Sequence, residues 1–228
     1  MSKKVLLGMS GGVDSSVAAI LLKKQGYDVV GATMKLWEAP ITDAKKVCEK
    51  LGIEHHVIDL REEFKKRVID NFVCTYMCAK TPNPCVECNK FMKFDAFYKF
   101  AKEYDCDYIA TGHYAKIIYS EKYNQYVLTK SNAEAKDQSY FLYGINKEIL
   151  PYIIFPLSEF NDKSEIRKIA EENGLEVAQK KDSQEVCFIP NNDYVEFLKE
   201  YNCDEHLYDK TNMSGEIVLS TGEILGKH

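Results

Sequence analysis

The sequence predicts an α/β fold in which a parallel sheet is wound with helices. Three apolar segments have the length and composition of buried strands: residues 5–7, 29–34 and 56–60. Helical patterns separate them, and alternation of strands and helices is typical of a parallel sheet. Because ligands of such sheets bind at the carboxyl ends of the strands, the segments that follow the strands are the first candidates for a functional site.

The first strand runs directly into a glycine turn, Ser10 to Ser16 (SGGVDSS), and an apolar helical stretch begins at Val17. The first N–H groups of a helix have no internal partners, and its dipole is positive there, so this turn is suited to an anion. Gly11 and Gly12 would let the backbone approach a phosphate closely. The turn lacks the lysine of GxxxxGK[ST] and does not fit GxGxxG, so it is a phosphate site of another kind.

The next segments predict further elements of this fold. Helices are expected over 42–51, stopped by Gly52, and over 61–77. Residues 81–90 (TPNPCVECNK) contain two prolines and predict a rigid loop, with a new helix from Cys88 or Asn89. Four lysines are expected on the solvated face of that helix, with phosphate contact as the alternative: Lys90, Lys93, Lys99 and Lys102.

The second half of the chain predicts shorter elements. A fourth strand over 106–110 ends in Thr111-Gly112-His113, where the glycine suits close approach to a nucleotide and the histidine could face a ligand or lie in the core. The remaining expectations are a hairpin over 117–128, a helix over 163–173 capped by Asn161 or Asp162, a short strand ending at Ile189 that carries Cys187, a helix capped by Asn192, and a hairpin over 216–225.

Composition narrows the functional class. The chain has 228 residues with 45% hydrophobic residues, which is enough for one domain and part of a second. Its net charge of −5 gives no overall attraction to nucleic acid, so RNA contact would depend on local patches. No apolar run reaches the length of a membrane span, and the first strand follows Lys4 at once, so we expect a cytoplasmic protein without a signal peptide.

Eight cysteines in a reducing compartment favour thiol, metal or redox chemistry over structural disulfides. The spacing Cys74-x3-Cys78-x6-Cys85-x2-Cys88 allows a zinc site, an iron–sulfur cluster with a distant third cysteine, or a nucleophile at Cys88 activated by a helix N-terminus. Cys74 and Cys78, at helical spacing, are more simply small buried side chains. The cysteines expected to be structural are Cys48, Cys106 and Cys203.

Five ordered segments carry a resemblance to a known family. SGGVDSS resembles the loop of the PP-loop ATP pyrophosphatases, and TPNPCVECNKFMKF, TGHYA, KDQSYFLY and DSQEVCFIP follow it in the order found in the tRNA-specific 2-thiouridylases, the MnmA family. The resemblance implies a Rossmann-like sheet of the HUP class with helices on both faces. It also implies a catalytic domain over 1–190 and the start of a tRNA-contacting domain over 191–228.

The family's activity would be ATP- and Mg²⁺-dependent 2-thiolation of the wobble uridine of tRNA, with sulfur from a cysteine desulfurase or a sulfur-relay protein. By resemblance, Cys88 is the nucleophile and Cys187 carries the persulfide. The residues matching nucleotide contacts are Gly8, Met9, Ser10, Gly11, Gly12, Val13, Asp14, Ser15, Met34 and Gly112. Those matching tRNA contacts are Asn83, Pro84, Cys85, His113, Lys136, Asp137 and Gln138.

Two departures from the family keep alternatives open. Many relatives carry Asp where Cys85 stands, so Cys85, Cys88 and Cys187 are also candidate ligands of a [4Fe-4S] cluster. Relatives also continue well past residue 228, so the chain is expected to be truncated or a short form. The alternative functions are a PP-loop ligase that makes amides or amidines, and a non-catalytic fragment that binds ATP or a sulfur donor.

Overall fold

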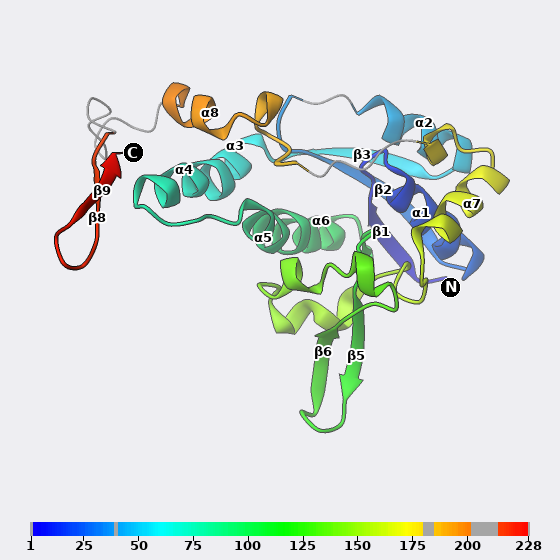
Figure 1. The fold of residues 1–228 in the computed structure, drawn as a ribbon. Coiled ribbons are helices and arrows are strands. Elements are labelled where there is room, and N and C mark those ends of the chain that lie inside the picture. Colours follow the sequence, from blue (N-terminus) through cyan, green and yellow to red (C-terminus); the bar gives the residue numbers. More distant parts are fainter. Residues whose placement is uncertain (1, 39–40, 180–184, 202–213, 228) are drawn as a thin grey trace.

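The computed structural model describes residues 2–38, 41–179, 185–201 and 214–227. A five-stranded parallel sheet of order β3-β2-β1-β4-β7 lies at its centre, with helices on both faces, as the sequence predicts (Figure 1). The strands are β1 (Lys4–Gly8), β2 (Asp28–Lys35), β3 (Glu54–Asp59), β4 (Tyr108–Ala110) and β7 (Ile153–Ile154).

The helices divide between the two faces. One face is covered by α1 (Val13–Lys24), α2 (Thr42–Leu51) and α7 (Lys163–Glu172). The other is covered by two long helical stretches that contain short α and π segments. The first comprises α3 (Arg61–Phe64), a π segment Lys65–Ile69 and α4 (Asp70–Met77), and the second comprises α5 (Pro84–Cys88), a π segment Asn89–Ala96 and α6 (Phe97–Glu103).

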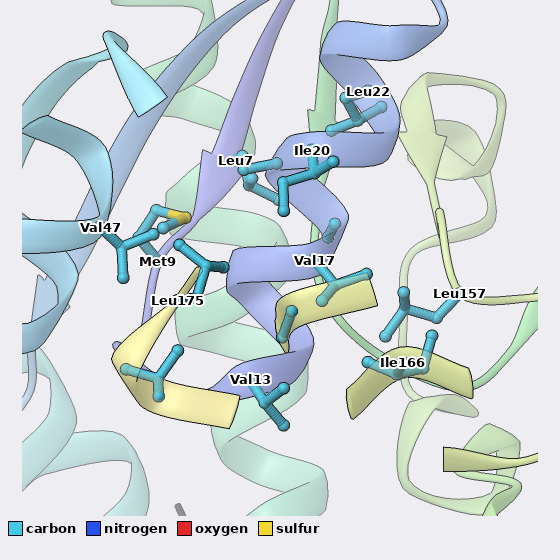
Figure 2. Close-up of a cluster of buried hydrophobic side chains, with 14 of the residues drawn as sticks. Leu7, Met9, Val13, Val17, Ile20, Leu22, Val47, Leu157, Ile166 and Leu175 are labelled. Carbon is cyan, nitrogen blue, oxygen red and sulfur yellow. The ribbon is translucent and has the colours of Figure 1, made fainter. Parts of the chain in front are cut away.

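Successive side chains of β1 point to opposite faces of the sheet, and each face has its own hydrophobic core. Val5 and Leu7 pack against the helices of the first face, whereas Leu6 packs with Phe64 and Met92 on the second. Figure 2 shows the first core, where Leu7 lies beside Ile20 of α1 and Met9 lies beside Val47 of α2. A strand buried on both faces explains why residues 5–7 are continuously apolar.

The order of the strands indicates where a ligand would bind. Successive strands step from β1 outward to β3, and the chain then returns to the other side of β1 to form β4. The strand order therefore reverses between β1 and β4, and the crevice outside their carboxyl ends is where doubly wound sheets bind ligands. The glycine turn follows β1, and Thr111-Gly112-His113 follows β4.

Several predicted elements are confirmed. α2 begins at Thr42 and ends at Leu51, and Gly52 adopts the left-handed conformation with a φ of 60°. α7 begins at Lys163, where the Asp162 side chain accepts a hydrogen bond from Ser164 N at 2.6 Å. The hairpins are also present, as β5 (Lys116–Ser120) with β6 (Gln125–Thr129) and as β8 (Glu216–Val218) with β9 (Ile224–Lys227).

The prediction of a rigid loop through residue 88 was wrong. α5 begins at Pro84, with Asn83 at the N-cap accepting a hydrogen bond from Val86 N at 3.3 Å. Proline is tolerated at the first helical position because the N–H it lacks would have no helical partner there. Cys88 is therefore the fifth residue of the helix rather than its start.

The short strand ending at Ile189 is also absent. Residues 186–189 form a turn closed by a hydrogen bond from Ile189 N to Val186 O at 3.1 Å. Their apolar side chains pack among helices instead of joining the sheet. α8 (Tyr194–Glu200) follows and is capped by Asp193, not Asn192. The predicted positions 182–184 and Cys203 lie outside the described residues.

Other short elements complete the fold. They are 3-10 helices at Glu134–Lys136, Ser139–Leu142, Lys147–Tyr152, Glu176–Gln179 and Pro190–Asn192. Across the described parts of the chain, no helix has the length and apolar character needed to span a membrane.

Candidate active site

A cavity of about 510 Å³ opens at the carboxyl ends of β1, β2 and β4. Its walls come from segments that are far apart in the chain: the glycine turn, the end of β2, the start of α5, the residues after β4 and the turn at 186–189. One end is therefore the predicted phosphate site and the other is lined by cysteines. The fold brings the two predicted halves of the site into one space.

The glycine turn is shaped by its own hydroxyls. Ser10 N donates to Ser15 Oγ at 3.3 Å, and Ser15 Oγ donates to Gly12 O at 3.1 Å. Gly12 stands at the N-cap of α1 and offers no side chain to cap the first N–H groups. The start of α1 therefore keeps backbone donors and the positive end of its dipole available for an anion.

At two positions near the start of α1, a side chain larger than that of glycine would clash with its neighbours. Gly11 has a φ of +73°, and a Cβ on it would lie 2.8 Å from Asp43 Cβ. A Cβ on Gly112 would lie 2.9 Å from Asp14 C and Ser15 N, in the backbone of the first turn of α1. Gly8 differs, because a Cβ there would meet its neighbours at 3.6 Å or more. The residues after β4 thus pack directly on the start of α1.

The structure separates the predicted nucleotide residues into two groups. Those that line the cavity are Gly8, Met9, Ser10, Asp14, Ser15, Met34 and Gly112. Those that do not are Gly11, Gly12 and Val13. Val13 is 3% exposed and belongs to the core, so the second group shapes the turn from behind.

Asp14 has two partners that the sequence did not indicate. Lys163 Nζ, at the start of α7, pairs with Asp14 Oδ2 at 2.7 Å, and Tyr114 OH donates to Asp14 Oδ1 at 2.8 Å. These partners lie 149 and 100 positions away in sequence. Only the helix start at Lys163 was predicted, and nothing in that pattern singled out its side chain.

Cys85, Cys88 and Cys187 all line the other end of the cavity. Cys88 is buried, whereas Cys85 and Cys187 are exposed, and all three are thiols. The predicted nucleophile and the predicted persulfide carrier are therefore brought together across 99 positions of sequence, with no disulfide between them.

Burial controls the acidity of these thiols. Burial raises the pKa of Cys88, which is opposite to the activation expected for a helix N-terminus. Cys88 lies too far into the helix for that effect, and the earlier expectation was wrong. Desolvation raises the pKa of Cys187 to about 12, with the charges of Cys88 and Cys85 adding to the rise.

Lys93 lines the cavity, although the sequence predicted that it would lie on the solvated face of its helix. Its charge opposes the rise in the pKa of the thiols of Cys88 and Cys187, and it also acts to lower the pKa of His113. Lys93 lies in the π segment, where hydrogen bonds join residues five apart, so the helical phase differs from that of the α-helix assumed from sequence. A mixed helix of this kind has no clear signal in the residue pattern.

The predicted tRNA contacts do not share one environment. Pro84, Cys85, His113 and Gln138 line the cavity. Asn83 and Lys136 do not, and the Asn83 side chain is used as the cap of α5. Asp137 is also held within the protein, accepting from Ser131 N at 2.9 Å and Ser139 Oγ at 2.5 Å.

His113 has the surroundings of a neutral histidine. Its Nδ1 and the Thr111 hydroxyl hydrogen-bond at 2.8 Å, and its ring lies 6.0 Å from Phe94 and 6.2 Å from Phe155. Desolvation, with a smaller contribution from Lys93, holds the pKa of His113 well below its usual value. Desolvation therefore favours the neutral form of the imidazole at this position.

The residues that line the cavity fit ATP with Mg²⁺ better than they fit an iron–sulfur cluster. The uncapped start of α1 fits a polyphosphate, and Asp14 is the one carboxylate among the described residues lining the cavity, which suits a phosphate-bound Mg²⁺. The three cysteines have the right chemistry for an iron–sulfur cluster. Among the described residues, however, no three Cys, His, Asp or Glu side chains are gathered as a metal site. As they are placed, these described side chains do not form the ligand set of a cluster.

Comparison with known proteins agrees with this fold. The chain is 47% identical over 242 residues to "tRNA-specific 2-thiouridylase MnmA" of Clostridioides difficile (strain 630), and 45% identical over 246 residues to the protein of that name in Natranaerobius thermophilus. Each alignment covers all of this chain and 65% of the relative. The chain thus spans less than two thirds of the length of these relatives.

A solved structure of a 4-thiouridine synthetase–RNA complex with bound ATP has a similar fold, with a TM-score of 0.57 and 22% identity. The match covers 86% of this chain and 50% of that one. A family model described as the tRNA methyl transferase HUP domain matches residues 3–191. The chain therefore belongs to the tRNA methyl transferase HUP domain family.

Proposed function

We propose that this chain carries the site of an ATP-dependent tRNA 2-thiouridylase, which replaces the C2 oxygen of the wobble uridine by sulfur. The observation that carries the proposal is that Cys88 and Cys187 line the same cavity as the glycine turn. A ligase that joins an amine to an adenylylated carbonyl has no use for two thiols beside its nucleotide. The relatives named above support the choice of substrate.

The proposed reaction uses the two ends of the cavity in turn. ATP, held with Mg²⁺ at the start of α1, supplies the leaving group. The C2 oxygen of uracil attacks the α-phosphorus, and pyrophosphate departs with the electrons of the broken bond. The terminal sulfur of a persulfide on Cys187 then attacks C2, and AMP departs with the former carbonyl oxygen.

Cys88 completes the transfer. Its thiolate attacks Sγ of Cys187, a Cys88–Cys187 disulfide forms, and the sulfur left on C2 becomes the thiocarbonyl. An external thiol reductant then returns the disulfide to two thiols. The sulfur atom is reduced in this step while the two cysteines are oxidised, so the electrons balance.

The exposure of the thiols supports this division of roles. Cys187 is exposed and within reach of a cysteine desulfurase or relay protein that loads its sulfur, whereas Cys88 is buried and shielded from outside thiols. His113 and Lys93 also line the cavity, and the charge of Lys93 acts to lower the pKa values of both thiols. Gln138, fixed by the hydrogen bond from Tyr114 N to its Oε1 at 2.9 Å, is placed to contact the uracil.

The test incubates the chain with tRNA, ATP, Mg²⁺, cysteine and a cysteine desulfurase, followed by a gel that retards thiolated RNA. Cys88→Ser and Cys187→Ser should abolish the retarded band. Cys78→Ser is the matched control, since that cysteine is exposed and does not line the cavity, and it should retain the band. A full-strength band from Cys187→Ser would overturn the proposal.

Cys85→Ser decides between the two sulfur routes. The persulfide route needs only Cys88 and Cys187, so this variant should keep most of its activity. Loss with all three cysteine variants would favour a cluster instead. If the wild-type chain itself gives no band, transfer of ³⁵S from the desulfurase to Cys187 still tests the first half of the proposal without tRNA.

A further inference from the structure

The turn that carries Cys187 is held by three apolar side chains, Val186, Phe188 and Ile189, and Phe188 is the one that contacts other aromatic rings. In the turn closed by Val186 and Ile189, Cys187 and Phe188 occupy the two central positions. Cys187 is exposed, and both side chains line the cavity. Phe188 is half-buried and packs with the aromatic side chains of three helices.

Three rings surround Phe188. Its centroid lies 5.7 Å from Phe64 in α3, 5.5 Å from Phe72 in α4 and 5.6 Å from Phe197 in α8. The rings of Phe64 and Phe72 meet it edge-to-face at 78° and 89°. Edge-to-face pairs at these separations are attractive and directional, so they fix the ring's orientation as well as its depth. We call Phe64, Phe72 and Phe197 the aromatic seat.

The seat is itself closed by α8. Tyr194 stacks on Tyr76 of α4 at 5.4 Å, and Tyr201 OH donates to Asp70 Oδ1 at 2.5 Å. Figure 1 shows α8 lying beside α3 and α4, away from the sheet. A helix that packs beside α3 and α4 therefore completes the surroundings of a cavity residue.

We propose that Phe188 is a positioning residue for sulfur transfer, and that its ring, held in the aromatic seat, fixes the turn so that Cys187 stands at the cavity that contains Cys88. The expected effect on sulfur transfer rests on the proposed function, whereas the ring contacts of Phe188 do not depend on it. Reaction between two groups is fast when both are held in place, and a thiol on a loose turn would lose that advantage. Phe188 touches no reacting atom in this account and acts through Cys187.

The experiment measures how readily Cys88 and Cys187 form a disulfide in a glutathione redox buffer. Two thiols and oxidised glutathione give the protein disulfide and two reduced glutathione molecules, so the equilibrium gives the effective concentration of one thiol at the other. Mass spectrometry identifies the disulfide by residue. Phe188→Ala should lower this effective concentration at least about tenfold, whereas Phe188→Leu, which keeps an apolar anchor, should lower it less than about threefold.

Phe160→Ala is the matched control. Phe160 is another half-buried phenylalanine, but it packs on the opposite core beside α1 and α7. It should leave the disulfide equilibrium unchanged. Phe197→Ala removes one ring of the seat without touching the turn and should lower the equilibrium in the same direction, so the test does not depend on one variant folding well.

A single-turnover assay with a preformed persulfide on Cys187 supplies the second readout. Phe188→Ala should slow transfer to tRNA while leaving the Kd for ATP at the wild-type value. The inference is overturned if Phe188→Ala has a wild-type disulfide equilibrium, or if Phe160→Ala shifts it equally. Failure of the wild-type chain to thiolate tRNA would count against the proposed function only, because the disulfide equilibrium is measured without tRNA.

Discussion

The two ends of the cavity are built in different ways. The phosphate end is made mostly of backbone and short side chains from one continuous turn, Ser10 to Ser15, whose hydrogen bonds are local. The cysteine end is assembled from α5, the π segment and the turn at 186–189, which meet only in the folded chain. The turn at the first end is formed by local contacts, with Gly112 and Lys163 packed onto it from distant segments, whereas the second end is assembled wholly from distant segments.

This difference predicts where substitutions act. Changes at the phosphate end should disturb backbone packing and stability, because little space remains around the turn. Changes at the cysteine end should alter thiol reactivity with smaller effects on folding, because two of its three cysteines are exposed. Four predictions follow this comparison, each giving a size by which it can be judged.

The largest effect is expected from Gly112→Ala. The new Cβ would lie 2.9 Å from backbone atoms of Asp14 and Ser15, so the segment after β4 must move away from α1. Overpacking of this kind costs about 1–3 kcal/mol, and we expect the upper part of that range because the obstacle is backbone. Gly8→Ala is the control and should change the free energy of unfolding in urea by less than about 1 kcal/mol, since its Cβ meets only ordinary contacts. Equal effects of the two variants would show that close packing on α1 is not the cause.

Lys163→Met should come next. It leaves the Asp14 carboxylate, which is partly buried, without the ammonium at 2.7 Å. Losing a charged hydrogen bond of this kind should lower the free energy of unfolding by about 1.5–3 kcal/mol. Lys45→Met breaks an exposed pair with Glu49 at 3.9 Å and should cost less than about 0.5 kcal/mol. If adding Asp14→Asn to Lys163→Met restored no stability, the pair would not be the source of the loss.

The sequence predicted the features that depend on neighbouring residues, and it did not predict the contacts between distant segments. The glycine turn, α2 and the caps of α7 depend on neighbouring residues, and their patterns identified them. The start of α5 was misplaced because Pro84 reads equally well as a helix breaker and as a first helical residue. Cys88 was a candidate from the cysteine spacing and Met34 from its position at the end of a predicted strand, whereas the role of Cys187 came only from the family resemblance. Lys163, Lys93 and the aromatic seat had no local signal, because each acts on a residue from a distant segment.

At the cysteine end, iodoacetamide should distinguish the thiols by burial. Cys88 is buried and its pKa is raised by that burial, whereas Cys85, three residues earlier, is exposed. At pH 8 in the folded protein, Cys88 should be alkylated at least about tenfold more slowly than Cys85, because only the thiolate reacts. In urea the two rates should converge. Similar rates in the folded protein would contradict the buried position of Cys88.

The smallest effect is a pH dependence from His113. Its pKa is lowered in the folded protein by desolvation, so the unfolded chain takes up the proton first as the pH falls. The stability gained from keeping it neutral is complete above the unfolded pKa of about 6.5 and declines as the pH falls below that value. His55, whose pKa is lowered mainly by desolvation, adds to the same decline. His113→Gln should weaken the loss of stability between about pH 7 and pH 5 by about 1 kcal/mol, measured by urea unfolding at each pH. An unchanged slope would show that the pKa of His113 is the same in the folded and the unfolded chain.

The path of one sulfur atom tests the central claim most directly. The chain is loaded with ³⁵S at Cys187, freed of the donor, and mixed with tRNA, Mg²⁺ and either ATP or no nucleotide. The account predicts that the label leaves Cys187 and appears as 2-thiouridine only when ATP is present, and that a Cys88–Cys187 disulfide forms in equal amount. Label that stays on Cys187 while the tRNA becomes thiolated, or transfer that proceeds without ATP, would contradict it.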